Sequence, residues 1–574
     1  MLIAVMRMLK ISSMVRRFFQ ICSLVLVAQA FASVVLAQQV RRDSADFELG
    51  RAVEILSNIM YEFDTKYVGK VDVDKLLSSA VYGMTRSTDP YSQYLSEKDM
   101  SEFDIMTTGK YGGIGSPIRK RGDYVVFSQP YEGFPADEGG VKSGDKILAI
   151  DGVDARKMSI DEVSRALRGD PETDVVVRVE RSYDGKRENL KLRRRRISVP
   201  SVPYAGIIRD GVGYIAHNDF IQGSYIEVRK ALEKLLAEGE LRGLVLDYRS
   251  NGGGLMREAV DIASLFVDHG ELIVSIRGRD SLAERQFKTE HNPIARDIPI
   301  VILVNGASAS ASEILAGSLQ DMDRAVVMGQ RTYGKGLVQS TSYLGYNTYL
   351  KLTTEKYYIP SGRCIQAHDY ASRNSDGTIA QVPDSLISEF KTRGGRRVYD
   401  GGGVVPDVKL EQQYFSRFAA MLISLGYIED WCDDYMRRHR DDKIDVRTFK
   451  LSDEEYNNFV AYMADKEVEY ESESRRALKA LEKALERDLY QEALRDELKR
   501  FETLIKDDKL SNLQTYRDDI EYMLTTELIM RYAYTRGSVE YYAITDEDVQ
   551  AAIDLILNEE EYRRILQEQH LPMH

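Results

Sequence analysis

The chain has 574 residues, of which 43% are apolar and 29% are charged, a composition typical of soluble globular proteins. This length excludes a single ordinary domain and predicts three or four. The formal net charge of −13 argues against nucleic acid as a partner.

The first 37 residues differ from the rest of the chain. They contain four basic residues and no acidic residue, and their mostly apolar stretch, 18–36, leads into Ala37 and the polar Gln38. This pattern predicts a signal peptide, residues 1–37, that is removed on export, with an uncut membrane anchor as the alternative. Removal of its four positive charges takes the formal net charge from −13 to −17. We therefore expect an exported protein, periplasmic or in the cell envelope, that is soluble or peripheral.

The sequence offers little evidence for disulfide bonds or for a metal site. Cys364 and Cys432 alone follow the predicted signal peptide, too few for a disulfide framework. Unpaired thiols are expected, although the two could pair after export. HExxH and CxxC motifs are absent from the sequence, so we expect neither a metal nor a cofactor.

The segment 44–105 predicts a helical hairpin. Apolar residues recur every three or four positions from Leu49 to Tyr67, and the pattern repeats over 71–84. The sequence then breaks at Asp89-Pro90, because proline disfavours helix in the preceding residue.

Residues 106–195 predict a small β-rich domain. A short strand, 124–127, precedes the run GVKSGDKILAIDG at 140–152, and a helix at 159–169 and a strand at 174–182 follow. This order resembles a PDZ domain. PDZ domains add an extended peptide to a sheet edge and hold its terminal carboxylate with backbone amides.

The PDZ resemblance implies a binding site for protein C-termini. The matching turn is Gly113, Ile114, Gly115 and Ser116, whose consecutive N–H groups can form an anion-binding nest. A pocket for an apolar last side chain could be lined by Ile114, Val163 and Leu167. Ordinary core positions are the alternative for these three residues.

The rest of the chain is organised around the stretch 296–340. An apolar strand, 298–304, leads into a small-residue turn and a helix, and a second strand at 325–328 leads to Lys335 between two glycines. A serine on a strand-to-helix turn can present its hydroxyl beside free backbone N–H groups. A buried lysine with a lowered pKa can take its proton. The stretch therefore predicts a Ser–Lys nucleophile pair.

This stretch resembles the carboxyl-terminal processing peptidases, also called tail-specific proteases. The family pattern is Ser-Ala-Ser-Ala-Ser-Glu followed by Gly-Lys-Gly-x-Val-Gln, here Ser308–Glu313 and Gly334–Gln339. The resemblance implies that Ser310 attacks, that Lys335, 25 residues later, is its base, and that Gln339 helps to hold the lysine. Either motif alone would indicate a small-residue helix start or a surface turn.

A third family element follows a predicted strand at 244–246. It reads D-Y-R-S-N-G-G-G-L at 247–255, with Tyr248 where the family has leucine. The resemblance implies that the N–H groups of Gly253 and Ala311 form the oxyanion hole, and the choice of Gly253 over Gly254 stays open.

The remaining core sequence also matches the family, at 350–366 and 403–408. A polar insert, 367–400, separates these elements and could edge the active site. A Ser-His-Asp triad that uses His217 and Asp247 is an alternative, but it has no local signature.

The C-terminal region, 411–574, predicts charged amphipathic helices. Ser452-x-x-Glu455 is a capping box, Thr545-x-x-Asp548 begins another helix, and 479–505 predicts one long helix with apolar positions that include Leu485 and Leu489. These stripes pack either against the core or against a second copy of the chain.

The sequence thus predicts an α+β multidomain protein. Its parts are the signal peptide 1–37, a helical segment 44–105, a PDZ-like domain 106–195, an α/β protease core 196–410 and a helical domain 411–574. By resemblance, the core is a crotonase-like ββα spiral.

The predicted function is an exported serine endopeptidase with a Ser–Lys dyad that acts on proteins or peptides with free C-termini. A non-catalytic PDZ scaffold and a structural assembly protein are the alternatives. A homodimer through the C-terminal helices and an adaptor or activator protein stay open.

Overall fold

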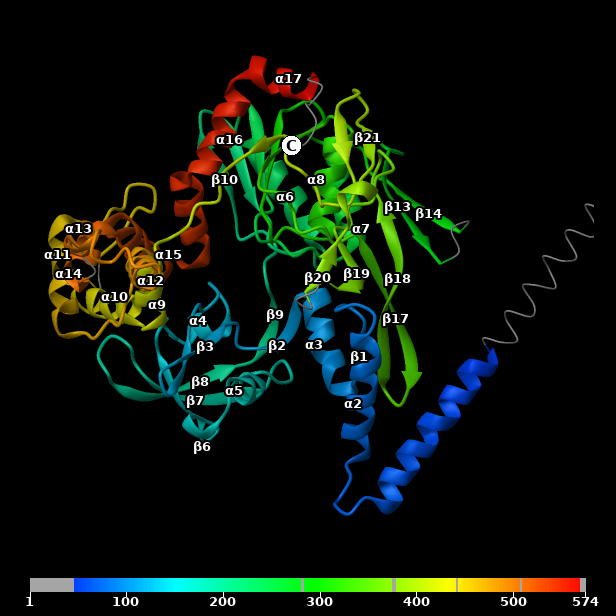
Figure 1. Ribbon diagram of the computed structural model, residues 1–574, viewed down its shortest axis with the longest axis horizontal. Helices are drawn as coiled ribbons and strands as arrows, with labels where there is room; N and C mark the ends of the chain where they lie inside the picture. The colour runs from blue at the N-terminus through cyan, green and yellow to red at the C-terminus, as the bar shows by residue number, and fades with distance from the viewer. Residues whose placement is uncertain (1–45, 280–282, 374–377, 440–441, 506–507, 568–574) are drawn as a thin grey trace, which may run out of the picture. The chain divides into compact units, whose positions relative to one another are not determined.

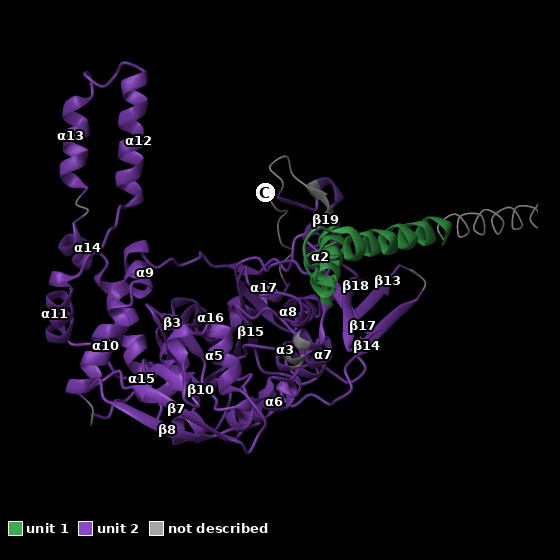
Figure 2. Ribbon diagram, turned by 90° about the horizontal axis from the view of Figure 1, so that it is seen from below, with its two compact units in different colours: residues 1–94 green, residues 95–574 purple. Residues whose placement is uncertain are grey.

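The computed structural model describes residues 46–279, 283–373, 378–439, 442–505 and 508–567. Two compact units are present, residues 1–94 and 95–574, coloured separately in Figure 2. The predicted signal peptide lies outside the described residues. Within these described ranges, no helix is both long enough and apolar enough to cross a bilayer.

The described part of the first unit is mainly helical. A helix over 46–66 is followed by α2 (Val73–Arg86), as the apolar spacing predicts. Asp72 caps α2 by accepting a hydrogen bond from the Lys75 N–H at 3.0 Å. After α2, the Asp89 carboxylate accepts from the N–H groups of Tyr91 and Ser92, both at 2.8 Å, and so forms the turn that the Asp-Pro pair predicts.

The second unit begins with α3 (Glu97–Thr108) and the PDZ-like domain. Its main sheet has the order β3-β4-β5-β7-β8, with β6 paired to β5, so β3 lies at an edge. A capping box between Ser159 and Glu162 begins α5 (Ile160–Leu167). The strands are β3 (Ile118–Arg121), β4 (Tyr124–Phe127), β5 (Lys146–Ile150), β6 (Val153–Asp154), β7 (Asp174–Glu180) and β8 (Arg187–Arg193), and β2 (Lys110–Gly113) pairs separately with β9 (Arg195–Ser198).

The core domain is built on a six-stranded sheet in the order β10-β11-β12-β15-β16-β23. All neighbouring pairs from β11 to β23 are parallel, and β10 is antiparallel to β11. The strands are β10 (Tyr204–Arg209), β11 (Val212–Ala216), β12 (Gly243–Asp247), β15 (Ile300–Val304), β16 (Val326–Gly329) and β23 (Val408–Lys409).

Both faces of this sheet are buried, which explains why β15 is apolar at every position. Ile300, Ile302 and Val304 pack with α6 (Ser224–Ala237), α7 (Met256–Ala263) and α8 (Ala311–Asp321). Val301 and Leu303 pack with the final helices, α16 (Glu547–Leu557) and α17 (Glu559–Gln567). Figure 1 shows these two red helices over the sheet.

A second sheet of the core domain brings β13, β14, β17 and β18 together. Their bounds are β13 (Leu272–Gly278), β14 (Glu284–Lys288), β17 (Leu337–Gly345) and β18 (Thr348–Tyr358). The polar insert 367–400 forms two small hairpins, β19 (His368–Arg373) with β20 (Ile379–Gln381) and β21 (Glu389–Lys391) with β22 (Arg397–Tyr399).

The C-terminal region is helical, as predicted, and has its own core around Phe418, Trp431 and Leu524. Cys432 is buried there, and both it and the half-buried Cys364 are unpaired thiols. The helices before α16 are α9 (Arg417–Ser424), α10 (Tyr427–Arg438), α11 (Asp453–Tyr462), α12 (Glu473–Arg487), α13 (Arg495–Leu504), α14 (Lys509–Thr515) and α15 (Arg517–Thr545), and the last is interrupted at Ala533 and Tyr534.

The prediction of one long helix over 479–505 is wrong. The chain breaks after α12, where Leu489 takes a positive φ of 63° and is 89% exposed, and it returns as α13. Figure 2 shows α12 and α13 side by side. One apolar residue of each helix, Leu478 on α12 and Leu498 on α13, is buried, and the stripe does not run along a single rod. At α16, the N-cap is Asp546 and not Thr545.

Candidate active site

Ser310 lies on a strained turn between β15 and α8. It is the N-cap of α8, with φ 57° and ψ −113°, a conformation that costs a non-glycine residue backbone strain. The helix behind it is buried along its whole length. The turn is held from below by Asn251, whose carbonyl oxygen accepts from the Ala309 N–H at 3.0 Å and the Ser312 hydroxyl at 2.9 Å.

A buried carboxylate, Glu313, joins the serine turn to the loop that carries Lys335, here called the lysine loop. It accepts hydrogen bonds from the N–H groups of Ser310 at 2.8 Å, Gly334 at 2.7 Å and Lys335 at 2.9 Å. The Thr332 hydroxyl donates to it at 2.5 Å. Burial raises the pKa of Glu313 to about 7, although these donors act in the opposite direction. The backbones of Ser310 and Lys335 are thus fixed to one another.

The glycines beside Lys335 are required by close packing. A Cβ on Gly334 would lie 2.3 Å from the Ala367 Cβ, and a Cβ on Gly336 would lie 2.8 Å from the Gln366 N. Two hydrogen bonds add to this contact, from the Ala367 N–H to the Gly334 oxygen at 2.9 Å and from the Gly336 N–H to the Gln366 Oε1 at 2.7 Å. Gln366 and Ala367, which form the stem of the insert, therefore lie against the lysine loop.

A tyrosine hydroxyl also joins the two catalytic candidates. The Tyr357 hydroxyl on β18 lies 3.2 Å from the Ser310 carbonyl oxygen and also contacts the Lys335 carbonyl oxygen.

Gln339 lies on β17, and its side-chain amide donates to the Thr353 hydroxyl at 3.2 Å. Its hold on Lys335 and the proton transfer from Ser310 stay predictions.

The expected oxyanion donors lie beside the serine turn. A Cβ on Gly253 would lie 2.8 Å from both the Ala311 N and the Ser310 Cβ, whereas one on Gly254 would meet the Phe220 backbone. Gly253 therefore faces the nucleophile, which favours it over Gly254. In this conformation, however, the Gly253 N–H donates to the Asn251 Oδ1 at 2.8 Å. An oxyanion would have to replace that acceptor.

The alternative triad does not form. The Asp247 carboxylate accepts from the Tyr214 hydroxyl at 2.9 Å and from the Arg249 guanidinium at 2.6 Å. The His217 ring lies between Phe220 and Tyr248, and burial lowers its pKa to about 3. A histidine in this environment packs as a neutral ring.

The PDZ-like domain brings the predicted carboxylate turn next to α5. Gly115 has a φ of 76°, and the carbonyl oxygens of Ile114 and Gly115 accept from the Ala136 and Tyr131 N–H groups at 2.8 and 2.9 Å. Ile114, Val163 and Leu167 are all buried in the core of this domain, which fits the core alternative. A peptide pocket at these residues, and the carboxylate site at Gly113–Ser116, stay predictions.

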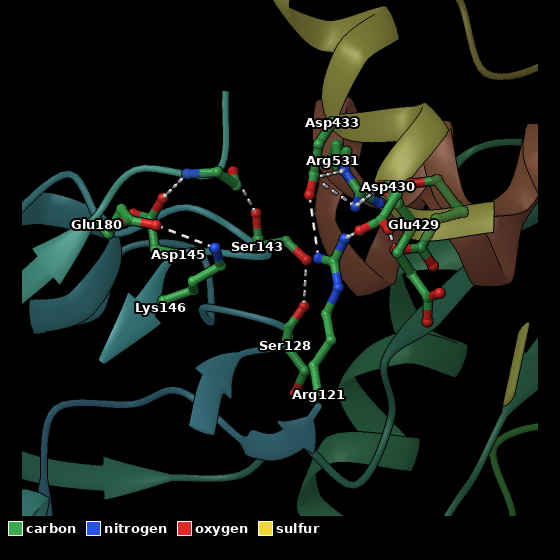
Figure 3. Close-up of polar contacts among 12 residues, drawn as sticks. Arg121, Ser128, Ser143, Asp145, Lys146, Glu180, Glu429, Asp430, Asp433 and Arg531 are labelled. Atoms are coloured by element: carbon green, nitrogen blue, oxygen red, sulfur yellow. Dashed lines mark hydrogen bonds and ion pairs between the residues drawn. The ribbon is translucent and has the colours of Figure 1, made fainter. Parts of the chain in front are cut away.

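The edge strand β3 carries a polar contact with the helical domain (Figure 3). Arg119 pairs with Glu429 on α10 at 2.6 Å, and Arg121 pairs with Asp430 and, at 3.0 Å, with Asp433. Arg531 on α15 also pairs with Asp433, at 2.9 Å. Beside these residues, the two domains line a pocket of about 490 Å³ that is open to solvent.

Sequence reasoning missed four supporting residues: Asn251, Glu313, Tyr357 and Gln366. Glu313 had a visible signal, because Ser310-x-x-Glu313 is a capping box inside the family motif. The other three act through contacts between segments distant in sequence, for which no local spacing exists.

The comparisons with known proteins match three parts of the chain. Residues 211–372 match Peptidase family S41, residues 126–181 match the PDZ domain, and residues 418–556 match the family described as "Probable PDZ-protease, C-terminal helical domain". The last match covers a region for which the sequence offered no resemblance.

Two relatives and one solved structure are similar to parts of the chain. The chain is 35% identical over 314 residues to a "Probable CtpA-like serine protease" of Staphylococcus aureus (strain COL), covering 54% of this chain and 62% of that protein. It is 33% identical over 349 residues to the "Carboxy-terminal-processing protease" of Bartonella bacilliformis, covering 59% of this chain and 79% of that protein. Among solved structures, the photosystem II D1 C-terminal processing protease is 28% identical with a TM-score of 0.33, covering 61% of this chain and 85% of that one.

Fold and site together define a peptidase core that carries a PDZ domain and a C-terminal helical domain. The chain belongs to the carboxyl-terminal processing peptidases of family S41. It spans less than two thirds of the length of the staphylococcal relatives that it matches. The predicted resemblance and the mixed fold are confirmed.

Proposed function

We propose that this protein is a serine endopeptidase in which Ser310 is the nucleophile and Lys335 is the general base. The observation that carries the proposal is the Glu313 carboxylate, which binds the N–H groups of both residues at 2.8 and 2.9 Å. Precise orientation of a nucleophile and its base supplies a large part of catalytic power. A surface turn would have no need of such a buried connection.

The proposed reaction starts with neutral Lys335, which takes the proton of the Ser310 hydroxyl. The Ser310 oxygen attacks a peptide carbonyl, and the oxyanion binds the N–H groups of Ala311 and Gly253. Each such donor stabilises the transition state by roughly 3 kcal/mol. The C–N bond then breaks, Lys335 returns the proton to the amine, and water hydrolyses the acyl-enzyme. Because the Gly253 N–H donates to Asn251 here, this reaction requires a small shift of the loop.

The PDZ domain is proposed to select substrates by a free C-terminus. Two observations support this: β3 is an edge strand, and the glycine-containing turn 113–116 lies ahead of it. We further propose export to the periplasm or cell envelope, since the first 37 residues have the composition of a signal peptide. A homodimer and an adaptor or activator protein stay open as further predictions.

The test is cleavage of an unfolded reporter that ends in Ala-Ala. Wild type, Ser310→Ala and Lys335→Ala are compared on reporters whose C-terminus is free or amidated. We expect cleavage by wild type alone, slowed by amidation. Equal cleavage of both reporters would refute the selection of free C-termini. Binding of the free tail without any cleavage would instead favour the non-catalytic PDZ scaffold.

A further inference from the structure

Arg249 is a buried cation directly after β12, two residues before Asn251. Its side chain is 9% exposed, and its guanidinium pairs with Asp247 at 2.6 Å. Two further carboxylates reach it from far along the chain, Asp546 at 2.8 Å and Asp548 at 3.1 Å. The Tyr542 ring lies 5.1 Å from the guanidinium carbon and adds a cation–π contact.

The two distant aspartates belong to the start of α16. Asp546 is the N-cap, and its carboxylate also accepts from the Val549 N–H at 2.9 Å. Asp548 lies in the first turn. Because α16 packs against β12 and β15, the start of the helix and the end of β12 lie together.

From Arg249, a short path of contacts leads to the serine turn. Ser250, with φ 61°, is followed by Asn251, whose N–H donates to the Tyr248 oxygen at 3.1 Å. The Asn251 backbone oxygen supports the turn through Ala309 and Ser312. Its side-chain oxygen holds the Gly253 N–H at 2.8 Å. The segment 249–253 therefore sets the position of the nucleophile turn and of one oxyanion donor.

We propose that Asp546 and Asp548 of the helical domain are positioning residues for the peptidase site, acting through Arg249. Charge-assisted hydrogen bonds are short and directional, so the two carboxylates restrict where the guanidinium, and with it the segment 249–253, can lie. The proposal rests on the proposed function for its kinetic consequence. Small displacements of a catalytic group reduce turnover strongly.

The test uses Asp546→Asn together with Asp548→Asn in the full chain. Asparagine retains the N-cap of α16 and the side-chain shape, so the helix still begins at the same residue. The matched control is Asp554→Asn on the same helix, whose 69% exposed carboxylate pairs with Arg209. We expect kcat on the reporter to fall about 10-fold in the double variant, with KM changed less than about 2-fold, because the affected donors act in the transition state. Asp548→Glu, which keeps the charge, should retain most of kcat.

Hydrogen exchange provides a readout that does not depend on cleavage. In the double variant, amides of 249–253 and 309–312 should exchange faster while those of α16 stay protected. The proposal is overturned if these amides keep their protection, or if Asp554→Asn lowers kcat as much as the double variant does. If wild type cleaves no reporter, the proposed function fails on its own, and exchange still decides whether the two aspartates hold the segment.

Discussion

Two of the charged contacts between the C-terminal helical domain and the rest of the second unit differ in their access to water. At the PDZ contact, Arg119 and Asp430 are 37% and 49% exposed, although their partners Glu429 and Arg121 are 4% and 16% exposed. At the core contact, Arg249, Asp247, Asp546 and Asp548 are all no more than 16% exposed. Charges interact weakly where water screens them and strongly where it is excluded. Water therefore reaches one partner of each outer pair at the PDZ contact, whereas it is largely excluded from every partner at the core contact.

Loss of Arg249 should break the core contact and have the largest effect on stability. Arg249→Met leaves three buried carboxylates without their cation, which should lower the free energy of unfolding by about 3 to 5 kcal/mol. Urea denaturation of the purified protein measures this change. Arg209→Met, which removes a cation that pairs with exposed Asp554, is the control and should cost less than about 1 kcal/mol. Equal losses in the two variants would contradict the comparison.

Glu313 extends the comparison to a buried carboxylate that is held by N–H and O–H donors, in contrast to the carboxylates paired with Arg249. Its pKa of about 7 lies above the ordinary value of 4.5, so the folded state keeps the proton longer than the unfolded state does. Stability should therefore fall as pH rises from about 4.5 to 7, by about 3 kcal/mol in total.

Glu313→Gln tests that pH dependence. Glutamine does not titrate, so the fall between pH 5 and 8 should be reduced, while the loss of acceptor sites lowers stability at pH 5. Urea midpoints at four pH values, with Glu284→Gln at an exposed position as control, measure the difference. An unchanged slope in Glu313→Gln would contradict the raised pKa.

Loss of Arg121 should break the PDZ contact at a smaller cost. Asp433 keeps Arg531 as its partner after Arg121→Met, and Asp430 is half exposed, so the expected loss is about 1 to 2 kcal/mol. Hydrogen exchange should show faster exchange in α10 and β3 with unchanged exchange in β12. Loosening of β12 to the same extent would mean that the two contacts are not independent.

The smallest effect is expected from Arg119, whose side chain is 37% exposed although its partner Glu429 is only 4% exposed. Arg119→Ala should cost about 1 kcal/mol at low salt, because it leaves the buried Glu429 carboxylate without this cation, and the difference from wild type should shrink as ionic strength rises. Thermal unfolding at two salt concentrations measures both values. A larger cost that does not depend on salt would show that water is excluded from this contact as fully as from the one at Arg249.

The sequence by itself determined the elements that depend on local patterns. The apolar run of β15, the Ser-Ala-Ser-Ala-Ser-Glu run and the Gly-Lys-Gly motif are each contained within a few residues of sequence. They were enough to predict the mixed fold, the family and the Ser310–Lys335 pair. The break at Leu489 was missed because apolar spacing continues through it, and only the packing of α12 on α13 selects the turn.

Tertiary structure alone decided which distant residues support the site. Arg249 and Asp546 are separated by 297 positions, and Gly336 and Gln366 by 30, so no spacing rule connects them. Their contacts exist because α16 covers one face of the sheet and the insert stem returns beside the lysine loop. Burial makes these contacts important for stability, because water could replace the same hydrogen bonds if the groups were exposed.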